Sequence, residues 1–291
     1  MTRPPSRSRV RPANVVPLAF AAGLVVSACG DSGPSRSEVV GSATETIVPA
    51  RYAELAAAAE TVVHDVQTWC DGEDATAATD SISAARDEWL TLRPYSFGPA
   101  NERRSMFIID PNIREDDVDE LGADGAAVDA DSLRNLAGAD QRGWQAVEHL
   151  VAGELTDRRC EYALGASQLT ADELAAVADE WVEYGSAVAE DDEAANIALR
   201  NIVSESLFSV QMVIDEPNPD TDAVRLEGVR LALVGEDGTG GIAELLSDDL
   251  VERLTAELDA GDATALQITI NTEVVGELGT TVNFSDADGD G

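Results

Sequence analysis

A seam of apolar side chains at alternating spacings of four and three residues constrains this chain more than any other feature. Its members are Val48, Tyr52, Leu55, Ala59, Val62, Val66 and Trp69. Because an α-helix has about 3.6 residues per turn, these spacings return to one face of a helix. The pattern therefore predicts one long helix that packs in a bundle.

Further segments of helical periodicity follow the seam. They cover residues 75–92, 143–153, 170–188, 197–214, 226–233 and 242–258. Residues 268–275 allow either strand or helix, and we predict helix because everything around them is helical. Residues 93–138 interrupt the pattern with prolines, glycines and a run of acids, which predicts a long irregular excursion with only short helical pieces. We expect an all-α fold of two packed helical-bundle halves, 45–165 and 166–291, with the excursion and the Gly143 helix in the first half.

The N-terminus has the features of an export signal. Four arginines precede an apolar stretch, Val15 to Val26, that is too short for the roughly 20 residues of a membrane-spanning helix. The sequence Val26-Ser27-Ala28-Cys29 then resembles a bacterial lipobox. We predict a signal peptide over 1–28, lipidation of Cys29, and a flexible Gly/Ser/Pro-rich tether over 29–44. The protein would be anchored on the outer side of the cytoplasmic membrane or at the cell surface.

Charge and cysteine content narrow the possible partners and the compartment. The chain has 56 acidic residues against 19 basic ones, and its net charge of −37 argues against nucleic acid as a partner. Cys70 and Cys160 remain once Cys29 is assigned to the lipid. In an exported chain two such cysteines most simply form a disulfide, which we predict here.

The segment from Gly143 to Gly153 gathers polar groups beside an apolar stripe. Trp144, Val147 and Val151 share one helical face, and Glu148 lies at its edge, where we expect its carboxylate to be half buried. Gln145 and His149 flank that carboxylate. We take this turn as the candidate functional centre.

Arginines on other helices are candidate partners for this carboxylate. Arg86 and Arg93 share a helical face with Ile82 and Trp89, and Arg230 lies in the apolar stripe of residues 226–233. Because a guanidinium tolerates burial when it meets a carboxylate, these arginines could pair with Glu148 or with an anionic ligand. The alternative is that they pack their stems at the rim of the core and keep their heads in water. Glu205, within a nearly all-apolar helix, is a second candidate for a half-buried acid.

Several stretches carry a family likeness. They are Ala85-Arg86-Asp87-Glu88-Trp89-Leu90 with Phe97-Gly98-Pro99, Gly143-Trp144-Gln145-Ala146-Val147-Glu148, Leu226-Glu227-Gly228-Val229-Arg230, and a run from Leu278-Gly279 through Phe284-Ser285 to Asp288-Gly289-Asp290. In this order they resemble the imelysin-like family, which includes the insulin-cleaving membrane protease and the peptidase-like domain of a ferrous-iron uptake lipoprotein. The resemblance implies two bundle-like halves with a pocket between them, export, and a role as a metallopeptidase or in iron uptake.

The chain departs from the family's G-x-H-x-x-E signature, because Gln145 occupies the histidine position. An amide is a much poorer ligand for transition metals than an imidazole. His149 points about 100° further round the helix than Glu148, so it does not simply replace the missing histidine. The resemblance leaves Glu148 and His149 as candidate metal ligands, with iron or another divalent cation as the candidate cofactor.

Three functions remain open. The first is a binding protein in which Arg86, Arg93, Trp144, Gln145, Glu148 and Arg230 line a pocket for a small ligand or an iron species, which a permease partner in the membrane then receives. The second is a metallopeptidase, which normally needs two or three strong ligands and finds no H-E-x-x-H here. The third is a surface interaction protein in which Glu148 only stabilises the bundle. We favour the first, without catalysis.

Overall fold

The computed structural model describes residues 33–282, with gaps at positions 124, 136 and 237–238. The predicted signal peptide and lipidation site Cys29 lie outside the described residues, as does the end of the C-terminal motif, residues 283–291. Everything below concerns the described part of the chain.

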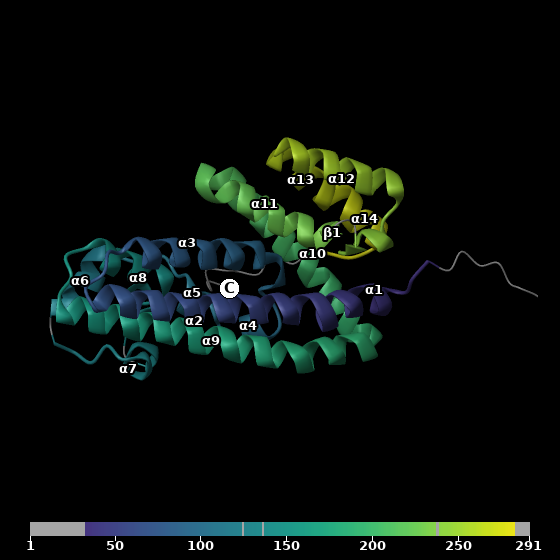
Figure 1. Cartoon of the computed structure of the whole chain (residues 1–291). Helices are drawn as coiled ribbons and strands as arrows, with labels where there is room; N and C mark the ends of the chain where they lie inside the picture. The colour runs from purple at the N-terminus through teal and green to yellow at the C-terminus, as the bar shows by residue number, and fades with distance from the viewer. Residues whose placement is uncertain (1–32, 124, 136, 237–238, 283–291) are drawn as a thin grey trace, which may run out of the picture. The chain divides into compact units, whose positions relative to one another are not determined.

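The fold is all-α, as predicted (Figure 1). The chain runs through α1 (Arg36–Ser42), the π-helical turn η1 (Ala43–Ile47), α2 (Val48–Cys70), α3 (Thr76–Thr91), η2 (Arg93–Tyr95), α4 (Pro99–Glu102), α5 (Met106–Ile109), α6 (Glu115–Ala123), α7 (Ala130–Asn135), η3 (Ala139–Gln141), α8 (Gly143–Ala152) and α9 (Asp157–Glu190). It continues through α10 (Asp192–Asp215), α11 (Pro219–Leu233), η4 (Ala243–Leu245), α12 (Asp248–Ala260), α13 (Ala263–Thr269), the π-helical turn η5 (Ile270–Val274) and α14 (Val275–Leu278). Two short strands, β1 (Gly235–Glu236) and β2 (Thr239–Gly240), pair antiparallel after α11.

The apolar seam of α2 forms the centre of the core. All seven of its predicted members are buried, and α2 packs mainly against α9 and α3. Tyr52 of α2 stacks on Trp181 of α9, with ring centroids 5.8 Å apart. Figure 1 shows α2 and α9 lying side by side. The periodicity of this one helix therefore identified both the helix and its buried face.

The predicted tether is wrong for residues 36–44, which are helical. Ser35 caps α1 in a capping box with Glu38, and Val40 is completely buried where α1 packs against α9 and α10. The Gly/Ser-rich composition suggested a linker, but burial of two consecutive valines stabilises a helix here.

The sequence Thr170-Ala171-Asp172-Glu173 has the spacing of a capping box, which predicts a helix start at Thr170, but α9 begins earlier. Thr156 is the N-cap instead, with its side chain accepting a hydrogen bond from the Arg159 N–H, and the helix then runs unbroken for 34 residues. The predicted boundary between the halves, at 165/166, falls inside this helix. Gly165 allows the close approach of α9 to the excursion, since a Cβ there would lie 1.8 Å from the Val128 carbonyl oxygen.

The second half is built on α10, which packs against α11, α13, α1 and η2. Within the described residues it is the one helix long and apolar enough to cross a membrane, and half of its most apolar window is buried inside the protein. A helix at the core of a bundle has this same character. The segment 268–275, which the sequence left open between strand and helix, is helical as predicted.

Cys70 and Cys160 form the predicted disulfide, with their Cα atoms 5.4 Å apart. It joins the end of α2 to the start of α9, so the two helices run antiparallel. The bond closes a loop with a sequence separation of 90 residues. A loop of this length loses much conformational freedom in the unfolded state when it is closed.

Replacing both cysteines, Cys70→Ser with Cys160→Ser, should lower the free energy of unfolding by about 4 kcal/mol. Urea unfolding of the wild type with and without a reductant measures this. The reductant should have no effect on the double variant. A wild type whose midpoint is the same in both conditions would contradict the assignment.

Gly228 of α11 touches the backbone of α3, and a Cβ there would lie 2.4 Å from the Thr91 carbonyl oxygen. Gly228→Ala should therefore cost about 1–3 kcal/mol of stability, because α11 must move away from α3. Gly276→Ala is the matched control, since nothing lies within 4 Å of its Cβ position. Thermal unfolding should show a loss for Gly228→Ala and no loss for the control.

Candidate functional site

Helix α8 presents the signature turn, and its glycine has a structural role. Gly143 adopts φ +82°, and a Cβ there would lie 2.6 Å from the Ile109 carbonyl oxygen. Only glycine adopts this backbone conformation easily while lying this close to α5. Trp144, Val147 and Val151 are buried, as the stripe predicted. Trp144 is completely buried, so its ring belongs to the core.

Arg86 of α3 joins two carboxylates. Its Nε lies 3.0 Å from Asp110 Oδ1, and its Nη1 lies 3.0 Å from Glu148 Oε2. The Asp110 side chain is 8% exposed, whereas the Glu148 side chain is 47% exposed. The structure thus brings Arg86 and Glu148 together. The Glu148 side chain is therefore about half exposed, as expected for a position at the edge of the apolar stripe.

His149 belongs to a different cluster. Its Nε2 lies 3.0 Å from Asp119 Oδ1, which also accepts a hydrogen bond from Arg159 at 2.9 Å. The His149 bond, followed by the charge and hydrogen bond of Arg159, holds the pKa of Asp119 below its ordinary value. His149 is therefore directed towards α6, and its ring forms no hydrogen bond with the Glu148 carboxylate.

The residues at this turn do not fit a transition-metal centre. Across the part of the chain that the structure describes, no group of three or more His, Cys, Asp or Glu side chains is arranged to hold a metal ion. Arg86 already binds one Glu148 oxygen, and Gln145 offers only an amide. A zinc site needs three or four strong ligands, which this turn lacks.

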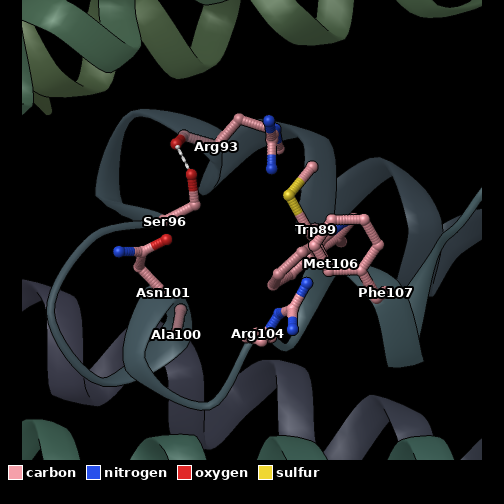
Figure 2. Close-up of a pocket in the computed structure, with 8 residues that line it drawn as sticks. All are labelled: Trp89, Arg93, Ser96, Ala100, Asn101, Arg104, Met106 and Phe107. Carbon is pink, nitrogen blue, oxygen red and sulfur yellow. Dashed lines mark hydrogen bonds between the residues drawn. The ribbon is translucent and has the colours of Figure 1, made fainter. Parts of the chain in front are cut away.

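Arg93 borders a small cavity of about 80 Å³ (Figure 2). The cavity is lined by Trp89, Arg93, Ser96, Ala100, Asn101, Arg104, Met106 and Phe107. Arg93 is only 8% exposed, and its guanidinium lies 5.7 Å from the centre of the Phe208 ring. Figure 2 shows the guanidiniums of Arg93 and Arg104 entering the hollow from opposite sides.

Glu205 of α10 is partly buried, as expected, and it lies near Arg93. Its Oε2 accepts a hydrogen bond of 3.3 Å from Ser96 Oγ. Burial raises the pKa of Glu205, and the Arg93 charge and the Ser96 hydrogen bond oppose this only in part. No nitrogen of Arg93 comes within ion-pair distance of a carboxylate in the described part of the chain.

The remaining predicted site residue, Arg230, contacts neither Glu148 nor the cavity lining. It pairs with Glu227 at 3.2 Å and with Asp259 of α12 at 2.7 Å. The structure brings Arg86 to Glu148 and places Arg93 at the cavity, but Arg230 has other partners.

Sequence reasoning missed the most buried charge of the protein. Glu173 of α9 is completely buried and binds Arg103 at 2.9 Å, Arg134 at 2.7 Å and Ser105 at 2.7 Å. Burial alone would raise the pKa of Glu173, but these hydrogen bonds outweigh it and hold the pKa below its ordinary value. The signal was weak, because Glu173 also fits a capping box and its partners lie in the irregular excursion.

The fold and site together define a disulfide-linked all-α protein with an arginine-lined cavity. The imelysin family model matches residues 48–274. The chain belongs to the imelysin family. No curated protein matches its sequence.

Two solved structures share the fold. An imelysin-like protein from Psychrobacter arcticum 273-4 matches with a TM-score of 0.73 and 17% identity, over 87% of this chain and 98% of that one. A "putative iron-regulated protein A precursor" from Parabacteroides distasonis ATCC 8503 matches with a TM-score of 0.58 and 14% identity, over 85% of this chain and 92% of that one. At these identities the likeness concerns the fold.

The two acids Glu173 and Glu148 should differ sharply in their effect on stability. Glu173→Gln should lower the free energy of unfolding by about 3 kcal/mol at pH 7, since it leaves two arginines without their buried counter-charge. Glu148→Gln should cost no more than about 1 kcal/mol, because an exposed ion pair is screened by water.

The pH dependence follows from the lowered pKa of Glu173. Its contribution is present above the unfolded-state pKa and is lost as the pH falls through the folded-state pKa. The difference between wild type and Glu173→Gln should therefore shrink on acidification, as urea unfolding at pH 7 and pH 3 would measure. A large loss for Glu148→Gln would instead assign the structural role to Glu148.

Proposed function

We propose that this chain is an exported, lipid-anchored binding protein of the imelysin family that holds a small ligand in the Arg93 cavity without catalysing a reaction. One observation carries the proposal. Arg93 is nearly buried at a cavity and interacts with the Phe208 ring and with the charge of nearby Glu205, yet its guanidinium has no hydrogen-bond or ion-pair partner among the described residues. A buried charge without a partner is costly, and a ligand would supply that partner.

The size and lining of the cavity fit a small polar ligand group beside an aromatic wall. A volume of about 80 Å³ holds several waters, and hence a group of a few non-hydrogen atoms. Trp89, Met106 and Phe107 form its apolar side. Arg86, on the same helix α3 as Trp89, binds both Glu148 and Asp110 and so holds α3, α8 and the segment after α5 together.

Iron uptake is a candidate context, suggested by the family and by the name of the Parabacteroides structure. No carboxylate lines the cavity. Iron would therefore enter as a complex whose own ligands supply the oxygen donors, and a permease in the membrane would receive it. A metallopeptidase is disfavoured, because the Glu148 turn lacks the ligands that hydrolysis on zinc requires.

Lipid anchoring is tested by Cys29→Ser in the native host. We expect the wild type in the detergent phase of a detergent partition and the variant in the aqueous phase, since acyl chains supply the membrane affinity. Cys70→Ser with Cys160→Ser is the control for loss of a thiol and should stay in the detergent phase. A Cys29→Ser variant that remains with the detergent would contradict the anchor.

Ligand binding is tested by native mass spectrometry of the full-length protein purified from its own membrane. We expect a population heavier than the lipidated chain by the mass of a small molecule, which Arg93→Gln reduces and Arg253→Gln leaves unchanged. Arg253 is a suitable control because it forms an exposed pair with Glu273, far along the chain from the cavity. If only the bare lipidated mass is found in every preparation, the binding function is not supported.

A further inference from the structure

Three guanidiniums near the cavity lie outside ion-pair distance of every carboxylate in the described part of the chain. Arg93 and Arg104 line the cavity, and Arg225 of α11 lies close enough to Arg93 for their charges to interact. None of the three guanidiniums donates a hydrogen bond to another residue in the described part of the chain. The pKa of Arg225 is lowered, first by burial and then by the charge of Arg93, and the charges of Asp110, Asp222 and Glu216 oppose this only in part. Like charges gathered in this way are unfavourable without a counter-ion.

This gathering is unusual in so acidic a chain. The net charge is −37, and acidic residues outnumber arginines about three to one. Elsewhere the arginines find carboxylates easily, as Arg103, Arg114 and Arg159 do. A site where unpaired guanidiniums accumulate is therefore a specific arrangement.

Two of these guanidiniums lie over aromatic rings, which attract them without forming an ion pair. Arg93 lies over Phe208 at 5.7 Å, and Arg104 lies over Phe107 at 5.2 Å, both measured to the ring centre. A cation over a ring face is attracted to it, but its N–H groups stay available in the plane of the guanidinium. Both forks can therefore still donate to an acceptor in the cavity.

The backbone at Arg104 gives an independent indication. Arg104 adopts φ +57°, and it is the one non-glycine residue with positive φ in the described ranges. A side chain in this conformation is strained, and such strain tends to occur at functional sites. Here it accompanies a guanidinium that faces Arg93 across the hollow (Figure 2).

We infer that the cavity is an anion site, in which Arg93 and Arg104 clamp a carboxylate or phosphate group of the ligand. A guanidinium fork matches the paired oxygens of either group, which accept two parallel hydrogen bonds. The positive charge of Arg225 adds to the attraction. Ser96 and Asn101 lie on the side of the cavity opposite Met106 (Figure 2). The Ser96 hydroxyl already donates to the Arg93 carbonyl oxygen, whereas the Asn101 amide can donate a further hydrogen bond. A bare metal cation is the class of ligand that this charge repels.

This inference rests on the proposed binding function and specifies the class of its ligand. Titration calorimetry of the full-length protein in detergent, with citrate and with inorganic phosphate as probes, tests it. At least one anion should bind with heat, and its affinity should fall as sodium chloride is added. Trimethyl citrate, which has the same skeleton without charge, should not bind. The anion that binds more tightly decides between a carboxylate and a phosphate.

Variants separate binding from stability. Arg93→Gln and Arg104→Gly should each lower the affinity for the anion at least tenfold, while Arg253→Gln should leave that affinity unchanged. Arg104→Gly should also unfold at the same temperature as the wild type or higher, because glycine relieves the strain at positive φ. That result would exclude loss of fold as the cause.

The inference fails if neither anion binds, or if both variants bind as the wild type does. Because the mass-spectrometric test does not depend on the ligand's charge, the two failures can be told apart. A neutral small molecule found on the purified protein, together with no heat from either anion, would overturn the anion site and leave the binding function intact.

Discussion

The packing of α2 against α9 is the constraint on which the rest of the structure depends. The α2 seam has nowhere to be buried except against neighbouring helices, and α9 extends for 34 residues along it. With the disulfide at one end, this antiparallel pair gives the other elements a fixed surface. Helix α8 packs on α9, α3 packs on α2, and the short helices α4, α5 and α7 of the excursion also lie against α9. The positions of Arg86, Arg93 and Glu148 follow from that frame.

The fold was predictable where the cause is local. The seam of α2, the stripe of α8 and the apolar circumference of α10 are properties of neighbouring turns, and the structure confirms them. The predictions were wrong where contacts between residues far apart in the sequence determine the local structure. Composition alone made residues 36–44 look like a linker, and a capping-box spacing at Thr170 suggested a helix start inside an unbroken helix. Burial of Val40 and the long contact of α9 with α2 override those local signals.

The site was predictable only in part, for the same reason. A helical face can show that Arg86 and Trp89 point in one direction, but it cannot show which carboxylate 62 residues away will meet the arginine. Glu148 is only half buried. Glu173 is completely buried, is held by two arginines, and fixes the excursion to α9. Arg104 left no trace in the periodicity, since its orientation comes from one left-handed backbone residue in an irregular segment.

The disulfide has a further consequence. Every residue that lines the cavity, together with Arg86, Asp110 and Glu148, lies between Cys70 and Cys160 in the chain. Oxidation of one thiol pair thus encloses the cavity lining and the Arg86 cluster within a single covalent ring. Maturation of the centre is coupled to the redox state of its surroundings. A chain held in a reducing compartment would contain the same side chains but lack the closure that limits their separation.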